Sequence, residues 1–163
     1  MTAAIAALLL AAKSRTEVLV DRTLGTNIGN MTGNGGLAAV FDGTTSQGFA
    51  SCAQSGSGVG YVGKTHSSAK IFSRATIYGA NNLGFSGSNN SCTLEIYGKN
   101  GSAPASSTDG TLIGTVTFTD TGDESAGRAI TSTDTSTAYL HWWCRINTTA
   151  AIVMAEIVWY ELV

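Results

Sequence analysis

Charged residues are scarce in this chain of 163 residues, and that scarcity limits what it can fold into. Lys, Arg, Asp and Glu make up 12% of the sequence, about half of their usual share. Long surface helices need Glu, Lys and Arg, whereas strands and turns accept the Thr, Ser, Gly and Asn that fill the gap. The composition therefore favours a β-protein. Hydrophobic residues still reach 43%, which argues against wholesale disorder.

The sequence also lacks a basic surface and a membrane-spanning run. Its 9 Lys and Arg face 11 Asp and Glu, for a net charge of −2, and no basic cluster suited to nucleic acid appears. The apolar stretch in Met1 to Ala12 holds only about ten residues and has no basic segment before it, unlike a membrane helix or a signal peptide. We therefore expect no nucleic-acid partner, no membrane insertion and no cleaved leader.

Cysteine is rare and irregularly placed. Cys52, Cys92 and Cys144 are widely spaced, and an odd count without a C-x-x-C pair indicates neither a disulfide framework nor a zinc site. Two interpretations stay open: buried apolar thiols, or one disulfide between Cys92 and Cys144.

Motifs for catalysis are missing too. His66 and His141 are the only histidines, and there is no G-x-S-x-G, no H-E-x-x-H and no phosphate-binding glycine loop. Paired carboxylates for glycoside hydrolysis remain available, but most of them fall in turn-forming segments, where Asp is expected anyway. They are Glu95, Asp109, Asp120, Asp123, Glu124 and Asp134. We therefore expect a protein that is not an enzyme.

Two regions of the chain differ in amino-acid composition. Residues 2–13 are rich in Ala and Leu without Gly or Pro, which predicts a short helix. This helix would be apolar nearly all round, so it needs a surface to pack on. Glu17 to Leu24 follows as a first strand. We predict an anchoring or oligomerisation arm over 1–24 and a second unit over 25–163.

The second unit reads as strands separated by turns. After a Gly- and Asn-rich loop at Gly25 to Gly36, the predicted strands are Gly58–Gly63, Ile71–Tyr78, Cys92–Gly98, Gly114–Thr119, Tyr139–Asn147 and Ile152–Leu162. Turn-forming segments lie between them, at Gly84–Asn90, Lys99–Gly110 and Asp120–Gly127.

Alternation within the strands predicts which side chains face inward. The expected core positions are Leu140, Trp142, Cys144 and Ile146, with Cys92, Leu94 and Ile96 in an earlier strand. The expected outward positions are Tyr139, His141, Trp143 and Arg145. Several short antiparallel strands with one apolar face each predict an all-β sandwich, most simply a jelly roll.

Short segments in a distinctive order resemble the discoidin, or coagulation-factor C-type, domain among the galactose-binding-like jelly rolls. AVFDGTTSQ at Ala39–Gln47 is similar to that family's "A-x-D-G-x-x-x-T" opening, and VMAEIVWY at Val153–Tyr160 is similar to its closing strand. Between these two segments, four others are similar to inner strands of the family: YVGK, RATIYG, LEIYG and Arg145-Ile146. The resemblance therefore covers roughly residues 37–162. Phe49 stands where the family has Trp. The Ala-rich start and the IYGANNLGF run look more like bacteriophage structural versions of this module.

The resemblance implies one structural calcium ion between the opening loop and the last strand. Carried over by position, Asp42 and Glu156 would supply carboxylates, while Ala39, Thr44, Gln47 and Ala155 would supply backbone carbonyls. Hard cations prefer such oxygen ligands. Thr44 and Gln47 replace the more usual Asn and Thr. The alternative is that Asp42 caps its turn and Glu156 is an edge charge.

Sugar binding in such domains uses loops at one end of the sandwich, where an aromatic ring stacks on the sugar and polar groups bond its hydroxyls. The candidate ligand-binding residues are His66, Arg74, Asn81, Asn82, Phe85 and Asn89. For each one taken alone, a core or turn role is the simpler interpretation.

We therefore expect a non-enzymatic virion surface protein: a head decoration, head spike or tail-fibre component, assembled in the host cytoplasm and exposed on the particle. Its arm would attach to other virion proteins or to copies of itself, and its jelly roll would bind a host glycan. The alternative is a free lectin-like carbohydrate-binding module. An enzyme with this fold as an accessory does not fit the short chain, and fold analogy alone proves no sugar binding.

Overall fold

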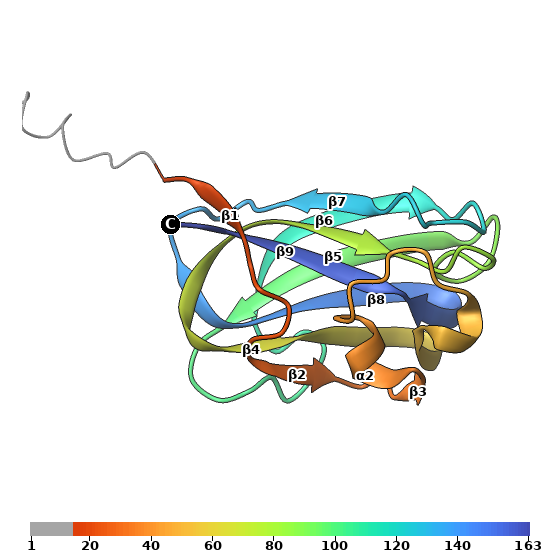
Figure 1. Ribbon diagram of the computed structural model, residues 1–163, viewed down its shortest axis with the longest axis horizontal. Helices are drawn as coiled ribbons and strands as arrows, with labels where there is room; N and C mark the ends of the chain where they lie inside the picture. Colours follow the sequence, from red (N-terminus) through yellow and green to blue (C-terminus); the bar gives the residue numbers. More distant parts are fainter. Residues whose placement is uncertain (1–14) are drawn as a thin grey trace, which may run out of the picture.

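The computed structural model describes residues 15–163, which form two layers of antiparallel strands (Figure 1). The predicted all-β antiparallel sandwich is confirmed. The predicted helix at 2–13 lies outside the described residues. Within them, no helix is long and apolar enough to cross a membrane.

The elements follow one another in a simple order. The strands are β1 (Glu17–Leu19), β2 (Thr26–Gly29), β3 (Gly33–Asn34), β4 (Ala53–Tyr78), β5 (Ser91–Lys99), β6 (Thr111–Thr119), β7 (Arg128–Thr131), β8 (Ala138–Met154) and β9 (Glu156–Leu162). Two helical turns, α2 (Gly36–Ala39) and η1 (Phe49–Ser51), lie between β3 and β4.

Strand β4 belongs to both layers. Its first part pairs with β2, β3 and β8, and its second part pairs with β9 and β7. A register shift between Thr65 and Lys70 marks the point where the strand turns from one layer to the other (Figure 1). The two strands predicted at Gly58–Gly63 and Ile71–Tyr78 are therefore parts of one strand.

The strands in the order β1-β9-β4-β8-β5-β6 enclose the main apolar core. Phe72 packs edge-on against Trp142 and Trp159, with ring centroids 5.5 and 5.8 Å apart. The expected inward residues Cys92, Leu94 and Ile96 are fully buried there. Aromatic rings from β4, β8 and β9 thus join the two layers, and these contacts fix the position of β9.

Several sequence predictions of elements were wrong. The predicted loop at Gly25–Gly36 contains β2, β3 and the start of α2, and β7 was missed. The predicted strand Ile152–Leu162 is divided at Ala155 between β8 and β9. Short strands such as these are set by pairing with distant segments, which local sequence does not encode.

The predicted outward face of β8 is also buried. Trp143 stacks on Tyr97 with a centroid distance of 5.6 Å and donates its ring N–H to the Ser107 carbonyl at 2.7 Å. Tyr139 and His141 are buried as well, whereas Leu140 is only half-buried. The connection between β5 and β6 covers this face. Both faces of β8 are therefore packed, and the prediction that one face is exposed to solvent was wrong.

The three cysteines are free and buried. The buried-thiol interpretation is confirmed and the Cys92–Cys144 disulfide is wrong. Burial raises the pKa of the Cys52 thiol to about 11, so the thiol stays protonated and apolar.

Candidate functional site

The structure brings the loop at 39–47 against the start of β9. The Ile157 amide donates to the Val40 carbonyl at 3.0 Å, and the Gly43 amide donates to the Glu156 carboxylate at 2.9 Å. Asp42 and Glu156, predicted to share an ion, therefore lie close together although 114 positions separate them along the sequence. We call Ala39, Asp42, Thr44, Gln47 and Glu156 the Gln47 cluster.

Gln47 is the centre of this cluster. Its side-chain nitrogen Nε2 lies 3.0 and 3.1 Å from the two carboxylate oxygens of Asp42, 3.0 Å from the Thr44 carbonyl oxygen and 3.4 Å from the Ala39 carbonyl oxygen. The residue is only 6% exposed. Its side-chain oxygen Oε1 is buried without a hydrogen-bond partner among the described residues. One buried donor thus serves four acceptors.

Glu156 carries the most perturbed carboxyl group of the cluster. The residue is 1% exposed. Burial raises its pKa to about 7, the Gly43 N–H acts against this, and the negative charge of Asp42 adds to it. Desolvation and a like charge both favour the neutral acid. Near neutral pH this carboxyl group is therefore half protonated.

The residues of the cluster do not fit a resident calcium ion in this arrangement. Calcium takes six to eight oxygens at about 2.3–2.6 Å, whereas the oxygens of Ala39, Asp42 and Thr44 surround a donor nitrogen at 3.0–3.4 Å. Ala155, the remaining predicted ligand residue, lies between the end of β8 and the start of β9. Among residues 15–163, no group of three His, Cys, Asp or Glu side chains lies close enough to hold a metal ion. The calcium ion stays a prediction.

A surface cavity of about 450 Å³ adjoins the cluster, and we call it the β9 groove. One wall comes from β1 and the segment after it, the other from the loop at 43–45, and β9 forms the floor. Its lining residues are Leu19, Val20, Asp21, Arg22, Thr23, Gly43, Thr45, Glu156, Ile157, Val158 and Trp159. Glu156 is shared between the groove and the Gln47 cluster.

Arg22 and Lys64 set the electrostatics around the groove. The end of the Arg22 side chain lies against Gly43, where a Cβ atom would be 2.4 Å from its nitrogen, and the φ of +88° at Gly43 favours glycine there. Lys64 is buried with its ammonium 4.4 Å from the centre of the Phe41 ring. Burial lowers the Lys64 pKa, against the attraction of Asp21 and Glu156. Both cations thus lie near the Glu156 carboxyl group.

Sequence reasoning missed the β9 groove, although it placed Glu156 correctly beside the 39–47 loop. The groove exists because β1 pairs with the edge of β9 and the segment at 20–23 follows beside it, opposite the loop at 43–45, and strand patterning cannot foresee this pairing. The exposed apolar Leu19 marks the groove only in the structure, because its 61% exposure cannot be read from the sequence.

The candidate sugar-binding residues do not form one site. Asn81 and Asn82 lie between β4 and β5 and hold the 46–49 segment: Asn81 donates to the Ser46 hydroxyl at 3.3 Å, and Asn82 accepts from the Phe49 amide at 3.0 Å. Asn89, with a φ of +67°, lies in the same connection. Arg74 is bound to Glu17 at 2.8 Å and lies over the Tyr160 ring.

Phe85 and His66 need correction as sugar contacts. Phe85 is fully buried and packs edge-on against Phe118, so its ring has no free face for a sugar. His66 is buried against Trp142, with ring centroids 4.5 Å apart. Burial, aided by the charges of Lys70, Lys64 and His141, lowers its pKa to about 4. Both residues belong to the core instead.

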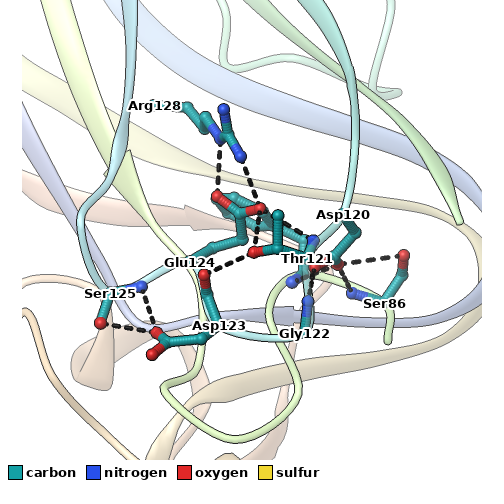
Figure 2. A network of polar contacts seen from close by, with 9 residues as sticks. Ser86, Asp120, Thr121, Gly122, Asp123, Glu124, Ser125 and Arg128 are labelled. Carbon is teal, nitrogen blue, oxygen red and sulfur yellow. Dashed lines mark hydrogen bonds and ion pairs between the residues drawn. The ribbon is translucent and has the colours of Figure 1, made fainter. Parts of the chain in front are cut away.

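A second buried acidic cluster lies between β6 and β7 (Figure 2). Asp120 accepts the backbone N–H groups of Phe85, Ser86 and Gly122 at 2.6–2.8 Å. Glu124 accepts two hydrogen bonds from Arg128 at 2.6 and 2.7 Å. This Asp120–Arg128 network therefore holds two turns together.

No family model and no curated protein matches the sequence. Solved structures match the fold. The family 32 carbohydrate-binding module of AlyQ, in complex with 4,5-unsaturated mannuronic acid, has a TM-score of 0.61 and 14% identity, covering 87% of this chain and 97% of that chain. The family 32 module from C. perfringens NanJ, in complex with galactose, has a TM-score of 0.62 and 15% identity, covering 90% and 100%.

A fucolectin from striped bass (Morone saxatilis) serum matches with a TM-score of 0.64 and 15% identity, covering 88% of this chain and 49% of that chain. At these identities the likeness shows the fold alone, an antiparallel β-sandwich like those of these modules.

Proposed function

We propose that this chain is a non-catalytic carbohydrate-binding module and that the β9 groove takes the sugar. The observation that carries the proposal is the fold: its matched structures include modules bound to a uronic acid derivative and to galactose, and a fucolectin. This supports the lectin-like alternative raised from the sequence more than virion display.

The chemistry of the β9 groove suits a sugar. A pyranose offers apolar C–H faces and a rim of hydroxyls, so its site needs apolar surface with a few polar groups at fixed places. Leu19 and Val158 provide the apolar surface, while Asp21 provides acceptors and Arg22 provides donors. The cavity of about 450 Å³ lies within the usual range of ligand sites, roughly 300–1,000 Å³.

A glycan array followed by calorimetric titration of the full chain tests both parts of this proposal. Thr45→Trp should fill the groove and weaken binding at least tenfold, an effect of about 1.4 kcal/mol. Leu112→Arg is the matched control, because Leu112 is an exposed apolar residue on β6 that does not line the groove.

The outcomes separate the function from the site. An array on which the protein binds no glycan contradicts the function. Glycan binding that Thr45→Trp leaves intact contradicts the groove and moves the site elsewhere on the sandwich.

Display on a virion is a second, separate proposal that rests on the sequence alone. It needs the arm at 1–24 to bind capsid or tail proteins or to form homo-oligomers, and it would use the jelly roll for host-surface glycans. Deleting residues 1–13 should then abolish docking or self-association and leave the jelly roll folded. Unchanged oligomerisation after the deletion would contradict this role of the arm.

A further inference from the structure

We infer that the Gln47 side-chain amide takes the place of the cation that the family resemblance predicts, so that the 39–47 loop beside β9 keeps its shape without a metal ion. The inference concerns how this end of the sandwich is closed, and it stands whether or not the chain binds a sugar.

The amide nitrogen lies where an ion would be ligated. Three of the predicted ligand residues, Ala39, Asp42 and Thr44, direct four oxygens at one point, and Gln47 Nε2 occupies that point. The surroundings decide the orientation of the amide, because every neighbour of this atom is an acceptor. With the amide reversed, its oxygen would face four other oxygens, and the cluster would repel itself.

Both acidic side chains of the cluster accept hydrogen bonds from N–H groups. Asp42 accepts from the Thr44 amide at 2.7 Å as well as from Gln47. Glu156 accepts from the Gly43 amide at 2.9 Å. Hydrogen bonds from N–H groups stabilise a carboxylate in the way a nearby cation does. The cost is the buried Gln47 Oε1, which has no partner among the described residues.

The oxygen shell is also too wide for the ion. Its radius of 3.0–3.4 Å around Nε2 would have to contract by roughly 0.5 Å or more to reach calcium–oxygen distances. Contraction requires the Gln47 side chain to leave first. The inference therefore predicts that calcium and the amide compete for one position.

Thermal unfolding of the full chain tests this competition. The wild-type melting temperature should be the same in EDTA and in millimolar calcium. Gln47→Ala removes the donor and leaves the acceptors facing each other, so in EDTA it should melt about 4–8 °C lower. Calcium should then recover much of that loss, because the position is vacated. Gln54→Ala, which removes the only other glutamine side chain, is the control and should ignore calcium.

Two results would overturn the inference. The first is a wild-type protein whose melting temperature falls in EDTA and rises in calcium, or which binds calcium in calorimetric titration; this measurement needs no variant. The second is a Gln47→Ala protein that melts like the wild type in EDTA, because the amide then holds nothing. If Gln47→Ala does not fold, Gln47→Thr repeats the test with the residue more usual in the family.

Discussion

The pKa values of two buried glutamates in this molecule are shifted in opposite directions, although both side chains are almost inaccessible to solvent. Glu156 is 1% exposed and Glu124 is 2% exposed. Burial raises the pKa of Glu156 to about 7. Burial also acts to raise the pKa of Glu124, but hydrogen bonds from Arg128 and Thr121 outweigh it and leave that pKa below its ordinary value.

The difference lies in the partners of each group. Glu124 has the forked guanidinium of Arg128 at 2.6 and 2.7 Å, whereas Glu156 has the Gly43 N–H at 2.9 Å and the like charge of Asp42 nearby. Burial alone therefore does not decide the charge of a carboxyl group; the partner does. Glu124, whose charged form is stabilised, belongs to the Asp120–Arg128 network, whereas Glu156, whose pKa is raised, lies at the β9 groove.

The largest expected effect comes from breaking the Asp120–Arg128 network at its centre. Asp120→Ala leaves the backbone N–H groups of Phe85, Ser86 and Gly122 without their acceptor. We expect a loss of about 3–5 kcal/mol in the free energy of unfolding, measured by urea denaturation. Asp42→Ala removes the acceptor of the Thr44 amide and one of the acceptors of the Gln47 side chain. It should cost about 1–2 kcal/mol, because Asp42 is exposed and water can replace the lost acceptor. Equal losses would contradict the distinction between the two clusters.

The pH dependence of stability should separate the two glutamates next. The folded pKa of Glu156 lies above the unfolded value of 4.5, so its contribution is full below pH 4.5 and is lost as the pH rises through about 7. Relative to Glu156→Gln, the wild type should lose on the order of 3 kcal/mol between these limits. Denaturation curves of both proteins from pH 4 to 8 measure it.

Glu124 should show the opposite sign in the same experiment. Its folded pKa is lowered, so its contribution is full above pH 4.5 and is lost as the pH falls through the folded value. Glu124→Gln should therefore weaken the pH dependence of the free energy of unfolding below pH 4.5 and leave it unchanged between pH 4.5 and 7. Two variants with the same pH profile would contradict the comparison.

A smaller effect should follow from making Glu124 resemble Glu156. Arg128→Ala removes the guanidinium, so burial is no longer outweighed and the Glu124 pKa should rise above its ordinary value. Carbon-detected NMR titration measures this rise, and stability should fall by about 2 kcal/mol. Arg74→Ala, which breaks a more exposed pair with Glu17, is the control and should cost less. A Glu124 pKa that stays low would contradict the role of Arg128.

The smallest effect is expected at the exposed edge of the same turn. Asp123 accepts from the Ser125 amide at 3.0 Å and from its hydroxyl at 2.6 Å, but solvent screens and replaces these bonds. Asp123→Ala should leave the melting temperature within about 1 °C of the wild type. A shift as large as that of Asp120→Ala would mean that the turn, not the buried acceptor, stabilises this region.

Part of the candidate site was predictable from the sequence. Asp42 and Glu156 were expected to meet because of the resemblance at Ala39–Gln47 and Val153–Tyr160, and the structure brings them together. The position of the Gln47 nitrogen was not predictable, because it depends on a side-chain conformation chosen by four acceptors. Loop composition does not reveal that Phe85 and His66, which were predicted as sugar contacts, are buried in the structure.

The sequence by itself determined the class of fold. The chain has few charged residues, alternating apolar residues and Gly- or Asn-rich turns, and with these features an antiparallel sandwich is the way to bury its hydrophobic residues. The cysteine thiols are apolar enough to be buried with them. These are local properties, which each segment carries wherever it lies.

Only the tertiary structure decided the course of β4 through both layers, the burial of Trp143, the charge of Glu156 and the existence of the β9 groove. Each of these depends on segments that are distant in the sequence: the connection at 100–110 covers Trp143, and the chain at 19–23 walls the groove. Pairing and desolvation energies arise between such segments when they meet, so no single stretch of sequence contains them.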